Sequence, residues 1–179
     1  MSHRTGIRCA GFTYIELLVA LFLIGLFVSL ALLSLPAQSP ADRLQREAER
    51  LYVRMDLARE EAVLQARTLG LRIDEKGYRF LHLHSDRWQA LADDRLLPAH
   101  ELPDSVQLSL DLEGIEVSLD NEEDENDTED ERPPPQIYFL AGGEIVPPFQ
   151  LRLRGEDTGA EFIIEPGDEK WLTLVEAGE

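Results

Sequence analysis

One carboxylate, Glu16, lies near the start of a strongly apolar segment that runs from Phe12 to Leu35. An unpaired carboxylate inside lipid costs about 2.5–3.5 kcal/mol on insertion scales, so it is expected to protonate or to find a cationic partner. Because Glu16 is close to one end of the segment, its side chain could instead extend to the lipid headgroups. Glu16 is therefore the first candidate functional residue, and its chemistry is ion pairing.

Two histidines, His82 and His84, are separated by one residue, so a β-strand would place both imidazoles on one face. Two imidazoles on one face can hold zinc, but a third and a fourth ligand are not apparent. His100 is distant in the sequence, and the single cysteine, Cys9, precedes the apolar segment. We therefore expect both histidines to pack or to face solvent, and we expect no metal site.

The sequence lacks the motifs of the common catalytic sites. It contains no Gly-x-Ser-x-Gly elbow, and the pair Gly142–Gly143 lacks the rest of a phosphate-binding loop. The formal net charge of -18 argues against nucleic-acid binding, which requires a basic surface. We expect neither enzymatic activity, nor a cofactor, nor a nucleic-acid partner.

An acidic stretch, DNEEDENDTEDERPPP, occupies residues 120–135 and has no apolar residue before its prolines. Such a stretch cannot bury surface and repels itself, which predicts a disordered, solvated loop. A calcium site is the alternative, because the acids at Asp120, Glu122, Asp124 and Glu131 have offsets like those of an EF-hand. However, Glu125 stands where that loop needs glycine, and the sequence predicts no flanking helices.

The elements that position these residues begin with a long helix. At about 1.5 Å per residue, the apolar segment is about 36 Å long, enough to cross a hydrocarbon core of about 30 Å. Pro36 and Pro40 predict a kink or short break where the chain leaves the membrane. Residues 36–69 then continue as an amphipathic helix, which Asp42 could cap and which Gly70 ends as the residue after the helix. The positions expected on its buried face recur every three or four residues: Leu44, Ala48, Leu51, Met55, Ala58, Ala62, Gln65 and Leu69.

Residues 70–179 change to a period of two, which predicts roughly seven or eight antiparallel strands. Turns are expected at residues 75–77 and at Gly142–Gly143, and a bulge or a turn at Gly114. We expect Trp88 and Trp171 in the core of this domain. The predicted fold class is therefore α+β, with a long N-terminal helix whose first half spans a membrane and whose second half packs on an antiparallel β-sheet or β-sandwich.

The N-terminus departs from an ordinary secretory signal. Arg4 and Arg8 supply the positive flank, but the small residues Ala10 and Gly11 precede the apolar segment. The positive-inside rule leaves residues 1–11 in the cytoplasm and sends the C-terminal domain outward.

The hexapeptide Gly-Phe-Thr-Tyr-Ile-Glu, residues 11–16, resembles the processing signature of type IV pilin-like proteins, although Tyr14 stands where leucine is commoner. The resemblance implies that residues 1–11 are a leader, that a membrane peptidase cuts between Gly11 and Phe12, and that Phe12 becomes N-methylated. Glu16 would then be the fifth residue of the mature chain, where the family pairs a glutamate with the N-terminal amine of a neighbouring subunit.

Within that superfamily, the chain resembles the H-type minor pseudopilins of type II secretion, the GspH family. The likeness lies in the segment EAERLYVRMDLAREEAVLQARTLGLRI, in YRFLHLHSDRW and in IYFLAGGEIVPPFQLRLRG. The last segment carries the family's C-terminal motif, here on Phe139, Gly143, Pro148, Phe149 and Leu151.

This resemblance implies a single-pass inner-membrane protein with a periplasmic domain, at or near the tip of a pseudopilus that helps to export folded proteins. The implied partners are the other minor pseudopilins, the major pseudopilin, the prepilin peptidase/N-methyltransferase, and possible contacts with exported substrates or the secretin. A minor pilin of a type IV pilus, acting in adhesion, motility or DNA uptake, is the alternative. A membrane-anchored domain of unrelated function is the third possibility.

Overall fold

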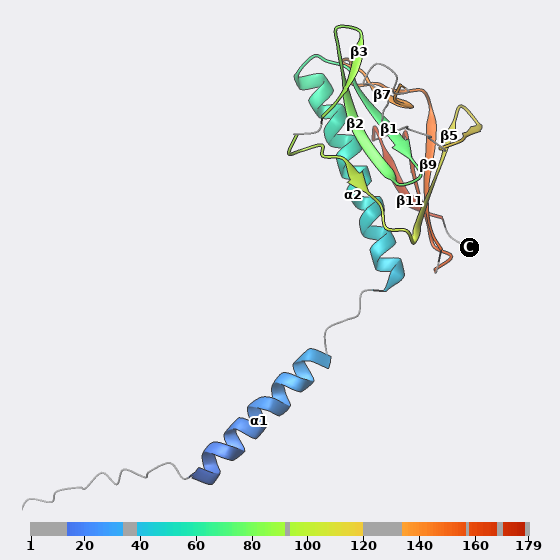
Figure 1. The fold of residues 1–179 in the computed structure, drawn as a ribbon. Coiled ribbons are helices and arrows are strands. Elements are labelled where there is room, and N and C mark those ends of the chain that lie inside the picture. Colours follow the sequence, from blue (N-terminus) through green and yellow to red (C-terminus); the bar gives the residue numbers. More distant parts are fainter. Residues whose placement is uncertain are drawn as a thin grey trace, which may run out of the picture. The chain divides into compact units, whose positions relative to one another are not determined.

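The computed structural model describes residues 14–33, 39–91, 94–119, 134–156, 158–167 and 170–177 of the chain. It divides into two compact units, residues 1–38 and residues 39–179. The first unit holds one helix, α1 (Tyr14–Leu33; Figure 1), and its large apolar side chains from Tyr14 to Val28 are all exposed. Among the described residues, no helix is long and apolar enough to cross a membrane.

The second unit begins with helix α2 (Pro40–Leu64), which starts at Ser39 and not at the predicted cap, Asp42. The Ser39 hydroxyl accepts from the Asp42 N–H at 3.1 Å, and the Asp42 carboxylate accepts from the Ser39 N–H at 3.1 Å. This reciprocal capping box, with Pro40 in the first turn, fixes a new helix start. The helix predicted to continue from residue 36, with a kink or short break at Pro36 and Pro40, thus starts at Pro40 with a cap of its own. Residues 34–38 lie outside the described residues.

The predicted end of the helix at Leu69 is wrong by five residues. Helix α2 ends at Leu64, and Ala66 turns the chain with a positive φ of 49°. Leu69 and Gly70 instead belong to the first strand, where both are buried. The apolar spacing of Leu69 fits a helix and a strand equally well, so periodicity alone could not place the boundary.

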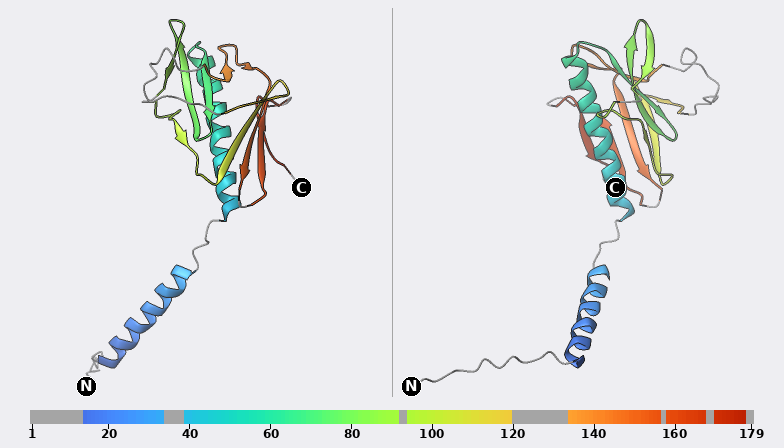
Figure 2. Two further views of the ribbon diagram at one scale, coloured as in Figure 1. Left: turned by 45° about the vertical axis from the view of Figure 1, so that its right-hand side comes forward. Right: turned by 60° about the vertical axis from the view of Figure 1, so that its left-hand side comes forward.

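The predicted stripe of α2 is confirmed from Leu44 to Ala62, whereas Gln65 is exposed and caps the end of the helix. The stripe is the buried face of the helix, and it consists of Leu44, Ala48, Leu51, Met55, Ala58 and Ala62. The helix contacts strands of two antiparallel sheets through this face, an arrangement that both views of Figure 2 show. The fold of this unit is therefore α+β, with a helix packed on antiparallel sheets, as the sequence predicts.

The first sheet has six strands in the order β3-β2-β1-β7-β8, with β4 paired to the end of β2. Its strands are β1 (Leu69–Asp74), β2 (Gly77–His84), β3 (Arg87–Ala90), β4 (His100–Glu101), β7 (Ile137–Phe139) and β8 (Ile145–Val146). The turn predicted at residues 75–77 joins β1 to β2, since Asp74 pairs with Gly77.

The second sheet has five strands in the order β11-β10-β9-β5-β6. Its strands are β5 (Val106–Leu112), β6 (Ile115–Val117), β9 (Phe149–Gly155), β10 (Glu161–Glu165) and β11 (Thr173–Glu176). Of the bulge and the turn predicted as alternatives at Gly114, the structure has the turn, with a φ of 86° between β5 and β6. The described residues thus form eleven strands, more than the seven or eight expected, because strands of two or three residues carry too little alternation to be recognised.

Candidate functional site

Glu16 lies in the first turn of α1, on a helix whose other described side chains are almost all apolar. Its side chain is exposed, and no hydrogen bond or ion pair joins it to another described residue of the chain. A carboxylate at this end of a helix is favoured by the helix dipole, which is positive at the N-terminus. Gly11 and Phe12, the predicted cleavage site, lie outside the described residues and stay predictions.

The five motif residues lie together at the crossover from the first sheet to the second. Phe139 ends β7, Gly143 lies in the β7–β8 turn, and Pro148 immediately precedes β9. Phe149 and Leu151 then enter the core from β9, where Leu151 pairs with Leu110 and Ile164 on the flanking strands. The chain therefore passes from the first sheet to the second through these five residues, three of which, Phe139, Phe149 and Leu151, are buried.

Gly143 is the one motif position whose backbone requires glycine. Its φ of 92° lies in the left-handed region, which side chains with a Cβ rarely adopt. A Cβ on Gly143 would lie 3.4 Å from Val63 Cγ2 and 3.7 Å from Arg59 Nη1. The turn therefore rests against the C-terminal part of α2, which fixes the position of the crossover relative to that helix.

A second anchor, which was not predicted from the sequence, holds the C-terminal end of the acidic stretch. Pro135 lies over Gly70 on the face of the first sheet that points away from α2. A Cβ on Gly70 would clash with the Pro135 ring, at 2.7 Å from its Cβ, and would come within 3.0 Å of Trp88 Cζ3. Arg72 Nη1 donates to the Pro134 carbonyl at 3.3 Å. A glycine inside a strand pattern is the signal that could have indicated this close approach.

The two prolines lead into β7 through Gln136, which binds the backbone of β1. Its Nε2 donates to the Ile73 carbonyl at 2.8 Å, and its Oε1 accepts from the Ile73 N–H at 2.9 Å. Residues 120–133, which hold the acidic positions and the possible calcium ligands, lie outside the described residues. The solvated loop, and calcium binding as its alternative, therefore stay predictions.

A polar cluster joins α2 to the edge of the first sheet. Glu47 accepts from Arg50 Nη1 at 2.9 Å, and its Oε2 lies 2.7 Å from His100 Nε2. Arg54 Nη1 donates to the Tyr78 hydroxyl at 2.9 Å. Burial raises the pKa of Tyr78, and the neighbouring Arg54 charge partly opposes that increase. These contacts fix β4 beside the helix.

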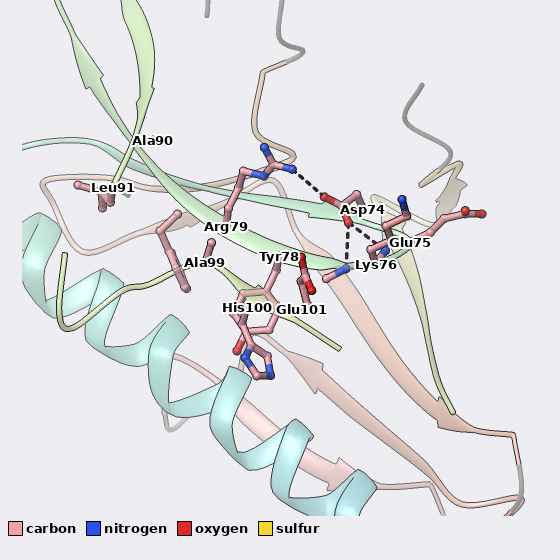
Figure 3. A pocket seen from close by; sticks show the side chains of 12 residues that line it. Asp74, Glu75, Lys76, Tyr78, Arg79, Ala90, Leu91, Ala99, His100 and Glu101 are labelled. Atoms are coloured by element: carbon pink, nitrogen blue, oxygen red, sulfur yellow. Dashed lines mark hydrogen bonds and ion pairs between the residues drawn. The ribbon is translucent and has the colours of Figure 1, made fainter. Parts of the chain in front are cut away.

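Beside this cluster lies an open cavity of about 710 Å³ between β2, β4 and the β1–β2 turn (Figure 3). Figure 3 shows charged side chains of both signs around it, including Asp74, Lys76, Arg79 and Glu101. The Asp74 carboxylate already binds two other groups that line the cavity. It accepts from the Lys76 N–H at 2.9 Å and from Arg79 Nη2 at 3.2 Å. Two of the charges in the wall, those of Asp74 and Arg79, are therefore paired with each other.

The two histidines of β2 lie side by side, with ring centroids 6.2 Å apart. The pKa of His82 is lowered, chiefly by burial and further by the charges of Arg67 and His84. Across the described residues, no three His, Cys, Asp or Glu side chains are grouped so that they could hold a metal. The histidines therefore offer packing and a titratable group.

The two tryptophans do not lie in the core, contrary to the prediction. Trp88 is half-buried on the outer face of the first sheet, where its ring centroid lies 5.6 Å from that of Tyr138. Trp171 lies before β11 and is exposed. Trp171 was predicted to point inward because it was assigned to a strand. It lies instead in the loop between β10 and β11, where strand periodicity does not apply.

The chain matches the protein family described as "Type II transport protein GspH" over residues 47–168. Type II secretion system protein H of Aeromonas hydrophila is 31% identical over 159 residues, which cover 87% of this chain and 86% of that protein. The protein of the same name from Pseudomonas aeruginosa is 35% identical over 145 residues, covering 80% of this chain and 81% of that protein.

Solved structures give the same result. The crystal structure of the minor pseudopilin EpsH of the type II secretion system of Vibrio cholerae superposes with a TM-score of 0.63 at 28% identity, covering 79% of this chain and 99% of that one. The solution structure of Escherichia coli GspH has a TM-score of 0.52 at 19% identity, which supports the fold alone.

Proposed function

We propose that this chain, which belongs to the GspH family of type II secretion minor pseudopilins, assembles at the tip of a periplasmic pseudopilus and helps to export folded proteins across the outer membrane. The observation that carries the proposal is the pairing of the GspH fold with a helix, α1, that exposes apolar side chains along its described length. Such a surface needs lipid or other helices around it. The family match favours this function over the type IV pilus alternative.

The membrane part of the proposal rests on the apolar segment from Phe12 to Leu35. That segment extends beyond α1 at both ends, and as a helix it would be about 36 Å long. We propose that it crosses the inner membrane once, with residues 1–11 in the cytoplasm and the domain from Ser39 onward in the periplasm. The arginines Arg4 and Arg8 support that orientation.

Glu16 has a specific role in this proposal. Cleavage after Gly11 would place a new amine on Phe12, four residues before Glu16. The carboxylate would then bind the amine of a neighbouring subunit, which removes the cost of an unpaired charge in lipid and sets the axial offset between subunits. The exposed position of Glu16 in the first turn of α1 supports such a contact.

The proposed partners are the other minor pseudopilins, the major pseudopilin and the peptidase that processes the leader. The motif residues, the capping of α2 and the proline anchor all serve packing, which supports a structural and not an enzymatic role. The periplasmic domain can thereby present fixed surfaces to neighbouring subunits.

The test is complementation of a strain that lacks this chain, with secretion of a type II substrate as the readout. Glu16→Gln keeps the shape of the side chain but removes its charge, and we expect secretion to fall by at least tenfold at equal protein level. Glu49→Gln, at an exposed glutamate of α2, is the matched control and should leave secretion unchanged. Full secretion without the chain, or with Glu16→Gln, would contradict the proposal.

A further inference from the structure

His82 lies at a corner of the domain where the end of α2, the start of β1 and the β2–β3 hairpin meet. It follows Tyr78 and Phe80 in the row of alternate β2 residues that faces α2, and both of those are buried in the core. Its partner on β1, Leu69, is also fully buried. His82 therefore occupies the last sheltered position of this row, since the next member, His84, is exposed.

The two ring nitrogens of His82 have different surroundings. The ring binds the backbone of Gln89, the residue opposite it on β3. The other nitrogen, Nδ1, is buried and has no hydrogen-bond partner among the described residues. A neutral imidazole tolerates this arrangement, because it carries a single proton and can direct it to Gln89. A charged imidazole carries a proton on each nitrogen, so protonation would bury an N–H donor without an acceptor.

The positive charges around His82 also disfavour a second proton. Burial lowers the pKa of His82, and the charges of Arg67 and His84 lower it further. Arg67 lies in the turn after α2, and His84 lies on the same face of β2 at a ring-centroid distance of 6.2 Å. Arg87 of β3 stands opposite His84 and adds another cation to this end of the sheet.

The carboxylates at this corner do not supply the missing acceptor. Glu61, in the last turns of α2, lies 3.6 Å from Arg67 and accepts from Gln65. Asp86 is exposed in the β2–β3 turn. Neither of them binds Nδ1 of His82, so no described anion at the corner compensates a charged ring directly.

The same corner connects α2 to the motif turn. The chain leaves α2 at Ala66, and the Arg67 N–H donates to the Ala62 carbonyl at 3.0 Å. One turn earlier, Val63 supports Gly143, whose Cβ, if present, would lie 3.4 Å from Val63 Cγ2. A change at the end of α2 would therefore reach the crossover between the two sheets.

We infer that His82 is a proton-controlled latch for this corner: the neutral imidazole keeps the corner closed, and uptake of a proton in mildly acidic solution opens it. Opening moves the ring into water, where its second N–H finds an acceptor and the repulsion from Arg67 is screened. It also loosens the end of α2 on which the motif turn rests. The latch would act within the domain itself, whether or not the chain takes part in secretion.

The direction and the upper limit of the effect follow from proton linkage. The pKa of His82 is lowered in the closed corner, so below pH 6.5 the open corner binds more protons, and opening becomes more favourable as the pH falls. A single imidazole with an ordinary pKa of about 6.5 can raise the ratio of open to closed corners by at most about tenfold between about pH 7.5 and pH 5.5.

The test is hydrogen exchange of the detergent-solubilised full chain, followed by mass spectrometry at these two pH values. Labelling times are scaled for the pH dependence of the chemical exchange step. We expect residues 61–69 and 80–90 to exchange about two- to tenfold faster at the lower pH. Low concentrations of urea should not change this exchange, as is typical of local opening. A dependence on urea as steep as that of β9 would mean that the corner opens only when the whole domain unfolds, and it would overturn the inference.

Variants identify the titrating group. His82→Gln removes the titration but keeps a side-chain N–H that can donate to Gln89, so the difference between the two pH values should disappear. His84→Gln, the matched control on the same face of β2, should keep at least half of the difference. Thermal melting verifies that each variant is folded. An unchanged difference in a folded His82→Gln chain would show that another group controls the corner.

NMR of the parent chain with labelled histidines gives a second measurement that needs no variant. The signals of the His82 ring should titrate with a midpoint below pH 6.5. A midpoint at or above pH 6.5 would show that the closed corner does not disfavour the charged ring, and it would contradict the latch.

Discussion

The outer faces of the two sheets are built by different means, although α2 packs against the inner face of both. On the first sheet, the outer face is covered by the chain itself, because Pro134 and Pro135 cross it. On the second sheet, the outer face carries polar side chains that pair across strands. The outer face of the first sheet therefore depends on tight packing, and the outer face of the second sheet depends on weak, solvated contacts.

The outer face of the first sheet behaves like a small second core. Leu81 is buried there, although it is not part of the main cluster, and Arg72 is only 2% exposed. Pro135 fills the space above Gly70 and lies beside Trp88. Since interiors tolerate little extra volume, this face should be sensitive to single added methyl groups.

The outer face of the second sheet is a polar ladder. Arg154 pairs with Glu161 across β9 and β10 at 3.4 Å, and Gln150 Nε2 donates to Glu165 at 2.9 Å. Cross-strand pairs of this kind contribute roughly 0.2–1 kcal/mol each. Individual substitutions on this face should therefore have little effect on stability.

The largest effect is expected from Gly70→Val. The new side chain would overlap the Pro135 ring and approach Trp88, so we expect the free energy of unfolding to fall by about 2–3 kcal/mol. Chemical denaturation of the full chain measures the change. Ser109→Val, which adds a side chain of the same kind to the outer face of β5, should change it by less than about 0.5 kcal/mol. Equal losses at the two positions would remove the distinction between the faces.

A smaller effect is expected from Trp88→Ala. The substitution removes the indole that packs beside Pro135 and Tyr138, so we expect a loss of about 1–2 kcal/mol, below the full cost for a core aromatic residue. Trp171→Ala removes an exposed indole and one cation–π contact, and it should cost no more than about 1 kcal/mol. Thermal melts of the two variants compare them directly, and a larger loss at Trp171 would contradict the comparison.

The Arg154–Glu161 pair should contribute less still. A double-mutant cycle with Arg154→Gln and Glu161→Gln is expected to give a coupling energy below about 1 kcal/mol, which decreases as salt is added. Denaturant titrations at low and high ionic strength provide the measurement. A coupling of several kcal/mol, independent of salt, would show that this face is as tightly constrained as the first.

The smallest effect is a pH dependence at His82. Its pKa is lowered in the folded state, so below pH 6.5 the unfolded chain binds more protons and stability decreases as the pH falls. His82→Gln should therefore flatten the loss of stability between about pH 7 and pH 5, measured by melting temperature. His84→Gln, at the exposed neighbour, should flatten it less. An identical slope in the parent and in His82→Gln would show that burial does not disfavour the charged imidazole.

Much of the architecture of residues 39–179 could be predicted from the sequence, because periodicity reports burial directly. The stripe from Leu44 to Ala62 and the turns at Gly114 and Gly143 followed from spacing and from backbone requirements. Family resemblance, rather than physical reasoning, identified the motif residues and the GspH relationship. Whether each long segment forms a helix or a strand could therefore be predicted from the sequence alone.

The errors arise where one residue satisfies two patterns. Leu69 fits both the helix stripe and a strand, and Gly70 fits both a helix stop and a close approach by another segment. Pro135, which is distant in the sequence, lies directly over Gly70 in the structure. Its position shows that Gly70 allows the close approach of another segment and does not end the helix. The stacking of Arg59 on Trp171 was likewise not predictable, because it joins α2 to the loop before β11.

The most direct test of the account is the intact mass and N-terminal sequence of the chain purified from its native membrane. The account predicts a mature chain that begins at N-methylated Phe12, and the loss of that product when Gly11 is replaced by a bulky residue. A chain that still begins at Met1, or that is cut after Leu35, would contradict processing as a pseudopilin and would leave Glu16 without its proposed amine partner.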